Sequence, residues 1–125
     1  MTKLNSYKDL LVWQKSIDLV KEVYKLTTNF PKTEIYGLTN QMRRAAVAIP
    51  SNIAEGYKRQ YLPEYIQFLS IANSSAAELE TQLIISAELE ETKKLGYSKV
   101  FSLLTEVMSM LHVLIENLKE KRTVP

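Results

Sequence analysis

The chain contains no cysteine, only one histidine and only three glycines. The absence of cysteine excludes disulfide bonds, thiolate nucleophiles and cysteine-ligated metals. Ser109 stands three residues before the single histidine, His112, so the Glu-x-x-His pairs of di-iron helix bundles are missing. The scattered glycines form neither a phosphate-cradling loop nor the Gly-x-Ser-x-Gly motif of hydrolases. We therefore expect a protein that is not an enzyme, with no catalytic residues, metal, cofactor or small-molecule substrate.

The length and composition are those of an ordinary globular domain. The 125 residues fit one domain over residues 1–125, and the 46% hydrophobic content is sufficient for a packed core. The polar N-terminus lacks the apolar stretch of a signal peptide, and no run approaches the ~18 apolar residues of a membrane span. We expect a cytoplasmic protein that does not bind membranes.

Helix-breaking residues gather in only three places, near residues 29–33, 56–63 and 94–98. Between these breaks, apolar residues recur every three or four positions, which is typical of amphipathic helices. The predicted helices cover residues of about 9–29, 34–56, 63–94 and 98–121. The predicted fold is all-α: an antiparallel up-down-up-down four-helix bundle with a long third helix.

Several residues have the positions of helix caps or breakers. Ser6 and Asp9 have the spacing of a capping box, Thr33 is a plausible N-cap and Gly56 a plausible terminator. Pro50 lies inside the second predicted helix, and we expect a kink there because the apolar pattern continues past it. In the first predicted helix, Trp13 and Tyr24 share an apolar stripe with Ile17 and Val20, which favours core packing over base stacking.

The charges are distributed unevenly along the chain. Residues 1–60 carry ten Lys/Arg and five Asp/Glu, whereas residues 61–97 carry two Lys and six Glu. A basic first half is suited to an anionic partner, but basic and acidic helices also attract each other within or between subunits. Tyr57 and Tyr61 flank Lys58 and Arg59 in a predicted loop. This alternation of aromatic and basic residues makes the loop the best local candidate for nucleic-acid contact. The candidate nucleic-acid contacts are Lys15, Lys21, Lys25, Lys32, Lys58 and Arg59.

The segment from Ala45 to Ala54 carries no charge over about three helical turns, which predicts a helix buried on every side. We predict an oligomer interface, in which small side chains allow a neighbouring subunit to approach closely. The predicted interface residues are Val47, Ala48, Ser51 and Ala54. Two apolar rows on the last helix also favour oligomerisation. The alternative is a binding site at Arg43 and Arg44, which border this segment; we expect them to pair with carboxylates such as Glu55.

Several of these segments resemble proteins encoded in intervening sequences of bacterial 23S ribosomal RNA genes. The similar segments include residues 9–15, Phe30-Pro31, Tyr36-Gly37-Leu38, residues 43–56, residues 78–83 and Leu95-Gly96-Tyr97. The resemblance implies a bacterial four-helix bundle that assembles as a homopentamer, and it implies no defined catalytic activity. A related branch is the accessory protein of diversity-generating retroelements, which binds nucleic acid through a strongly basic surface.

Three functions therefore remain open, of which the least favoured is an enzyme whose site the sequence does not reveal. The first is an oligomeric, non-enzymatic scaffold or accessory factor associated with RNA or DNA. The second is a protein-binding adaptor with no role in nucleic-acid binding.

Overall fold

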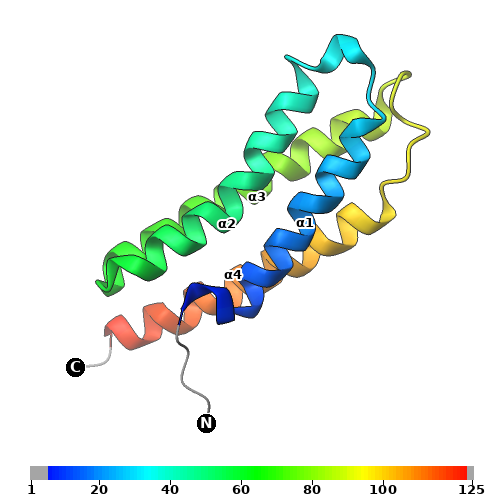
Figure 1. Cartoon of the computed structure of the whole chain (residues 1–125). Helices are drawn as coiled ribbons and strands as arrows, with labels where there is room; N and C mark the ends of the chain where they lie inside the picture. Colours follow the sequence, from blue (N-terminus) through cyan, green and yellow to red (C-terminus); the bar gives the residue numbers. More distant parts are fainter. Residues whose placement is uncertain (1–5, 124–125) are drawn as a thin grey trace.

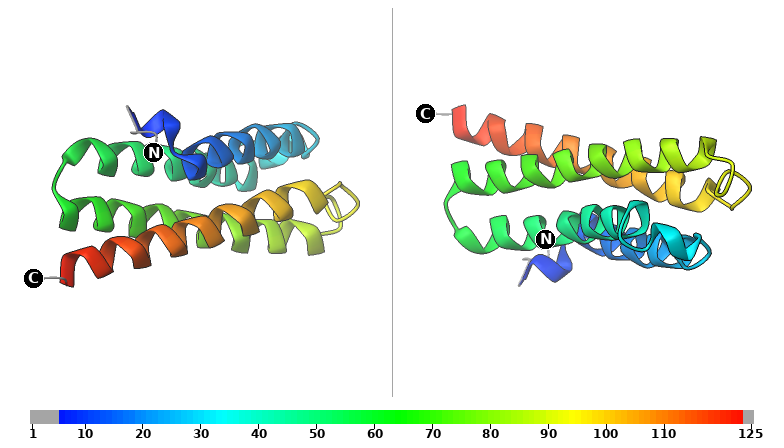
Figure 2. Two further views of the ribbon diagram at one scale, coloured as in Figure 1. Left: turned by 90° about the horizontal axis from the view of Figure 1, so that it is seen from below. Right: turned by 90° about the horizontal axis from the view of Figure 1, so that it is seen from above.

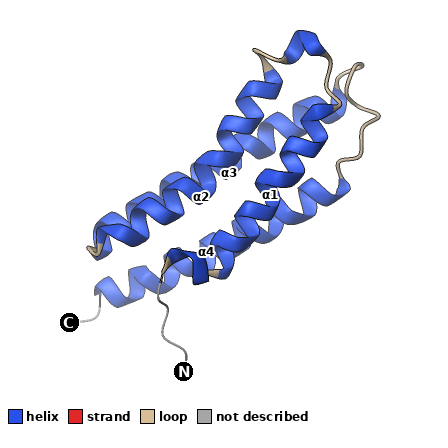
Figure 3. Ribbon diagram, in the orientation of Figure 1, coloured by secondary structure: helices blue, strands red, loops and turns tan. Residues whose placement is uncertain are grey.

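The computed structural model describes residues 6–123, with side chains up to Lys121. This part of the chain forms four α-helices and no strand (Figure 3), which confirms the predicted all-α fold. The helices are α1 (Leu11–Thr28), α2 (Leu38–Arg59), α3 (Leu62–Glu88) and α4 (Ser98–Thr123). Two short 3-10 helices, η1 (Tyr7–Asp9) and η2 (Lys32–Glu34), precede α1 and α2.

Each long helix packs against two others, in the cyclic order α1, α2, α3, α4. The α1–α2 and α3–α4 connections lie at one end of the bundle, and the α2–α3 turn lies at the other (Figures 1 and 2). The α3 helix has 27 residues and α4 has 26, so the third helix is not markedly longer than the fourth.

The helix starts differ in detail from the predicted ones. The capping box of Ser6 and Asp9 is present, but it caps η1 rather than α1. The prediction of Thr33 as the cap of the second helix was wrong, because this residue lies within η2. The α2 helix begins at Leu38, whose backbone N–H donates to the Glu34 carboxylate over 3.1 Å. A glutamate from the preceding turn therefore replaces the expected threonine.

The prediction that the second helix ends at Gly56 was also wrong. The helix continues to Arg59 and ends at Gln60, which has a left-handed conformation with φ of 57°. Pro50 lies inside this helix without ending it, as predicted. Two side chains bond backbone carbonyls beside the proline: Ser51 Oγ donates to Val47 over 2.8 Å and Asn52 Nδ2 to Ala48 over 2.7 Å.

The third helix ends at Glu88, six residues before the predicted end near residue 94. The following segment turns back because its polar groups bond each other rather than continuing the helix. Thr92 Oγ1 donates to the Ser86 carbonyl over 2.6 Å, and the Tyr97 hydroxyl donates to the Thr92 carbonyl over 2.9 Å. Thr92 and Tyr97 are both buried, so these bonds anchor the connection to the core.

One cluster of buried apolar residues joins all four helices. On α1 the buried row includes Leu19, Val23 and Leu26, whereas the row with Trp13 is only partly buried. The prediction of core packing was wrong for Tyr24, which is 41% exposed. Trp13 does pack against the edge of the core.

By length and composition alone, α4 is apolar enough between Ser98 and Lys121 to cross a membrane, in contrast to our reading of the sequence. In this structure, 28% of the apolar window is buried, and one face of the helix contributes six buried residues to the core. These residues are Val100, Leu104, Val107, Leu111, Ile115 and Leu118.

The α2 and α3 helices approach each other closely at Gly56. A Cβ atom at this position would lie 2.6 Å from Phe68 Cβ and 3.2 Å from both the Tyr65 carbonyl oxygen and Tyr65 Cδ1. Carbon atoms do not approach to 2.6 Å without displacement of one of them. Gly56 is therefore required for helix packing rather than for helix termination.

We expect Gly56→Ala to lower the free energy of unfolding by about 1–2 kcal/mol. Alanine favours the helix by roughly 1 kcal/mol, but overpacking typically costs about 1–3 kcal/mol. We expect the upper part of that range, about 2–3 kcal/mol, because the clash involves the Cβ of Phe68, which cannot rotate away. Denaturant unfolding at a fixed protein concentration measures the difference. The matched control is Gly96→Ala, because a Cβ there would meet no atom within 4 Å. A Gly56→Ala variant as stable as the wild type would contradict this account.

Candidate functional site

The outer face of α2 carries the four residues predicted as an oligomer interface. Val47 is 41% exposed, Ser51 is exposed, and Ala48 and Ala54 are half-buried. The prediction that this helix is buried on every side therefore does not hold for a single copy. The exposed side is small and uncharged, as the sequence indicates.

A groove of about 300 Å³ runs between α1 and α2 along this face. Its walls are mostly apolar, and they include three of the four predicted interface residues. The lining residues are Tyr7, Trp13, Ile17, Val20, Val47, Pro50, Ser51 and Ala54. The apolar stripe of α1 that we expected in the core thus forms one wall of a surface groove.

A second hollow of about 560 Å³ is also lined by Val47, together with Ala48, Arg43 and Arg44. The Arg43 guanidinium lies 4.4 Å from the centre of the Tyr24 ring, and its Nε donates to Thr27 Oγ1 over 2.8 Å. The prediction that Arg43 pairs with a carboxylate was wrong, because it joins α2 to α1 through these contacts. Arg44 is exposed and makes no ion pair with a described residue.

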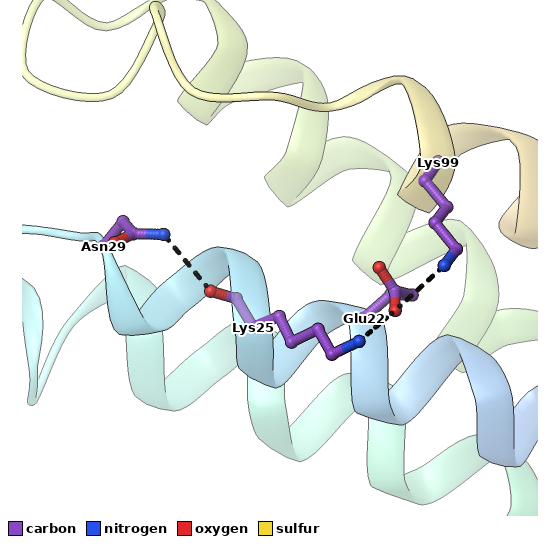
Figure 4. A network of polar contacts seen from close by, with 4 residues as sticks. All are labelled: Glu22, Lys25, Asn29 and Lys99. Atoms are coloured by element: carbon purple, nitrogen blue, oxygen red, sulfur yellow. Dashed lines mark hydrogen bonds and ion pairs between the residues drawn. The ribbon is translucent and has the colours of Figure 1, made fainter.

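Two of the candidate nucleic-acid contacts on α1 are paired with carboxylates. Lys15 Nζ lies 3.4 Å from Glu106 Oε1 on α4, and Lys25 Nζ lies 3.2 Å from Glu22 Oε2. Lys99 of α4 reaches the same Glu22 oxygen at 3.5 Å, so that one carboxylate joins two lysines (Figure 4). The α1–α4 face is therefore a mixed array of charges rather than a purely basic patch.

The environment of Glu22 favours its charged form. The side chain is only 15% exposed. Partial burial acts to raise its pKa, but hydrogen bonds and charges from Lys25 and Lys99 outweigh burial and hold the pKa below its usual value. Glu22 therefore stays ionised at neutral pH and partly neutralises the lysines around it.

The remaining candidate cations lie in different parts of the bundle. Lys21 is exposed on α1, Lys32 is exposed on η2, and Lys58 is exposed in the last turn of α2. Neighbouring Arg59 pairs with Glu55 at 3.2 Å, and its guanidinium lies 4.9 Å from the centre of the Phe68 ring. The structure thus spreads the six candidates along the molecule and does not gather them into one patch.

Tyr57 and Tyr61 do not form the aromatic loop that the sequence suggests. Tyr57 belongs to α2, and its ring packs edge-on against Tyr65, with the centroids 5.9 Å apart. Burial, together with the neighbouring Tyr57, raises the pKa of Tyr65 to about 12. Tyr61 is exposed at the turn. Of these two tyrosines, Tyr57 therefore has its ring engaged in packing within the bundle.

The exposed face of α3 is a feature that the sequence interpretation missed. Ile71 is 41% exposed and Ile85 is 46% exposed, with Ile84 and Leu89 nearby in the sequence. The sequence does indicate this exposure, because these residues fall outside the row of apolar residues at helical spacing that includes Leu69, Ala72 and Leu79 and is buried. Ile71 lies thirteen residues before Ile84, about 20 Å along the helix, so these are separate exposed aliphatic side chains rather than one contiguous patch.

No group of three or more potential metal ligands of the His, Cys, Asp and Glu types occurs in the described part of the chain. His112 is exposed on α4. The features described here that could bind a partner are therefore the surface grooves beside α2 and the charged face between α1 and α4.

Comparison with known proteins identifies one family. The model of the 23S rRNA-intervening sequence protein family matches residues 8–113. The search of curated proteins finds no match. Because the matched region extends from η1 into α4 and covers most of the 125 residues, the chain belongs to the 23S rRNA-intervening sequence protein family.

Proposed function

We propose that this chain is a non-enzymatic, antiparallel up-down-up-down helix bundle that assembles with copies of itself into a scaffold for nucleic acid in the bacterial cytoplasm. The observation that carries the self-assembly is the uncharged outer face of α2, where Val47 is 41% exposed above a groove. Five subunits is the best single number, and it rests on the family resemblance alone. The proposed kinship with the accessory protein of diversity-generating retroelements has the same basis.

The α2 face favours association for a physical reason. Apolar surface removed from water stabilises a complex by roughly 25 cal/mol per Å², from which the costs of association are subtracted. Small residues such as Ala48 and Ser51 lose little side-chain entropy on burial, and they let a second backbone approach closely. A monomer leaves the groove beside Val47 in contact with water.

We expect the wild-type chain to run as an oligomer, with a mass several times the 14.4 kDa of one chain, in size exclusion with light scattering. Ala48→Glu should lower that mass, because it places an unpaired charge in the contact. Ser102→Glu, at an exposed position on α4, is the matched control and should leave the mass unchanged. A wild-type monomer would refute self-assembly, and an unchanged mass for Ala48→Glu would exclude this face.

Association with nucleic acid is supported by two exposed cations outside α2, Lys21 and Lys32, which make no ion pair within the described chain. One copy offers few such charges. An oligomer repeats them around its circumference, and a long polymer that reaches several copies binds more tightly than each contact alone. The proposed binding is weak and tolerant of sequence.

Binding to labelled single-stranded RNA should weaken by roughly 50-fold between about 50 and 200 mM salt, if about four phosphates are neutralised at a slope of about −0.7 per contact. Fluorescence anisotropy measures this change. Lys21→Glu with Lys32→Glu should abolish binding, and Lys15→Glu with Lys25→Glu should weaken it less, because Glu106 and Glu22 already neutralise those lysines. The reverse order of effects would assign binding to the α1–α4 face.

A protein-binding adaptor is the second candidate. It is favoured by the ion pairs of Lys15, Lys25 and Lys99, which lower the positive potential of the α1–α4 face. The same anisotropy experiment separates the two functions. Absence of RNA binding at about 50 mM salt, where counterion release is strongest, would support the adaptor.

A further inference from the structure

Two rows of side chains on neighbouring helices have the same spacing of three and four residues. The α2 seam consists of Arg44, Val47, Ser51, Ala54 and Lys58. The α3 seam consists of Glu64, Gln67, Ile71, Ser74 and Glu78. Ala54 and Glu64 are half-buried, and the other eight residues are exposed. This spacing keeps each row on one face of its helix and is the spacing of residues that interlock between packed helices.

The two seams have complementary charges that are not neutralised within the chain. Arg44 and Lys58 of the α2 seam make no ion pair among the described residues, and neither do the carboxylates of the α3 seam. In each seam, the two charges are fourteen residues apart in the sequence. At 1.5 Å per residue this is about 21 Å, so both charges of one seam match both charges of the other.

The shapes between these charges are also complementary. The middle of the α2 seam projects little from the helix, because the side chains of Ser51 and Ala54 are small. The middle of the α3 seam is Ile71, a large aliphatic residue that is 41% exposed. A branched side chain over small residues is the arrangement by which one helix inserts a side chain between those of another.

We propose that the α2 seam of one copy packs against the α3 seam of a second copy, with Arg44 and Lys58 paired to the carboxylates of Glu64 and Glu78. This inference rests on the self-assembly proposed above. A contact between two α2 seams would instead bring cation against cation, and two α3 seams would oppose carboxylates. The contact is therefore between two different faces, and each copy donates one seam and accepts the other.

The positions of the two seams along the bundle axis, called heights below, are compatible with a ring. Gly56 lies against Tyr65 and Phe68, so in the proposed antiparallel arrangement Arg44 is level with Glu78 and Lys58 is level with Glu64. A rotation about an axis parallel to the helices preserves these heights. Repetition of the contact therefore brings opposite charges together at each step without sliding along the axis, as closure of a ring requires.

Charge reversal tests the pairing. Arg44→Glu with Lys58→Glu, and separately Glu64→Lys with Glu78→Lys, should each lower the mass in light scattering toward the 14.4 kDa of one chain. The variant with all four substitutions should recover the wild-type mass, because both seams are then reversed together. The matched control is Lys21→Glu with Lys32→Glu, which makes the same change in net charge as the reversal of Arg44 and Lys58, but away from both seams, and should keep the wild-type mass.

A cross-linking measurement does not depend on whether the reversed variants fold. Because the chain has no cysteine, Ser51→Cys and Ile71→Cys copies can be purified separately, mixed and oxidised. The mixture should form a disulfide-linked dimer of twice the chain mass, and neither variant alone should do so. Ser102→Cys mixed with Ile71→Cys is the control and should remain unlinked.

The outcomes separate this inference from the function on which it rests. A monomeric wild type would refute both. A wild-type oligomer whose mass is unchanged by either reversal, or is not recovered with all four substitutions, would overturn the seam contact alone. Loss of RNA binding without loss of mass for Arg44→Glu with Lys58→Glu would show that the α2 seam is a nucleic-acid surface instead, and would overturn the proposal.

Discussion

The close approach of α2 and α3 at Gly56 determines how the rest of the bundle is arranged. With only a hydrogen atom at this position, Phe68 Cβ can lie where a side chain at residue 56 would otherwise begin. Nearby in the same pair of helices, Ala46 and Ala72 are fully buried, and their small volumes suit the short distance between backbones. The inner side of α2 is thus occupied by its own chain, and its small outer residues are left for another molecule.

The sequence predicts the number and type of helices well, because a row of apolar residues at helical spacing reports directly on local structure. It predicts helix ends less well, because ends depend on contacts between distant residues. The third helix stops at Glu88 since Thr92 bonds the Ser86 carbonyl and Tyr97 bonds Thr92, and no propensity encodes this network. Gly56 illustrates the same limit, since a glycine near a helix end suits both termination and close packing.

The candidate site, like the fold, could be predicted from the sequence only in part. The small, uncharged character of residues 45–54 is visible in the sequence, and their outer face is exposed as an interface requires. The state of the lysines is not visible, because the carboxylate of Glu106 that meets Lys15 comes from the last helix. Tyr24 belongs to an apolar stripe by spacing, yet it lies at the surface, where the guanidinium of Arg43 lies over its ring.

The basic residues 1–60 and the acidic residues 61–97 form no ion pair with each other within the described part of the chain. Within the described residues, the ion pairs stay within one helix or loop, or join α1 to α4. None of them joins basic α2 to acidic α3, although these two helices approach closely enough to require a glycine. Gly56 occupies the close contact with α3, whereas Arg44, Lys58 and Glu78 lie at exposed positions.

A single copy therefore presents cations on one helix and carboxylates on the next, each screened only by solvent. Water stabilises such charges well, so they cost an isolated chain little. Pairing between copies adds little affinity by itself, because surface ion pairs are weak. It does select which faces meet, since a mismatched register opposes like charges. In the proposed assembly, the apolar face of α2 would provide the driving force for association, and the separated charges of α2 and α3 would determine the partner and the register.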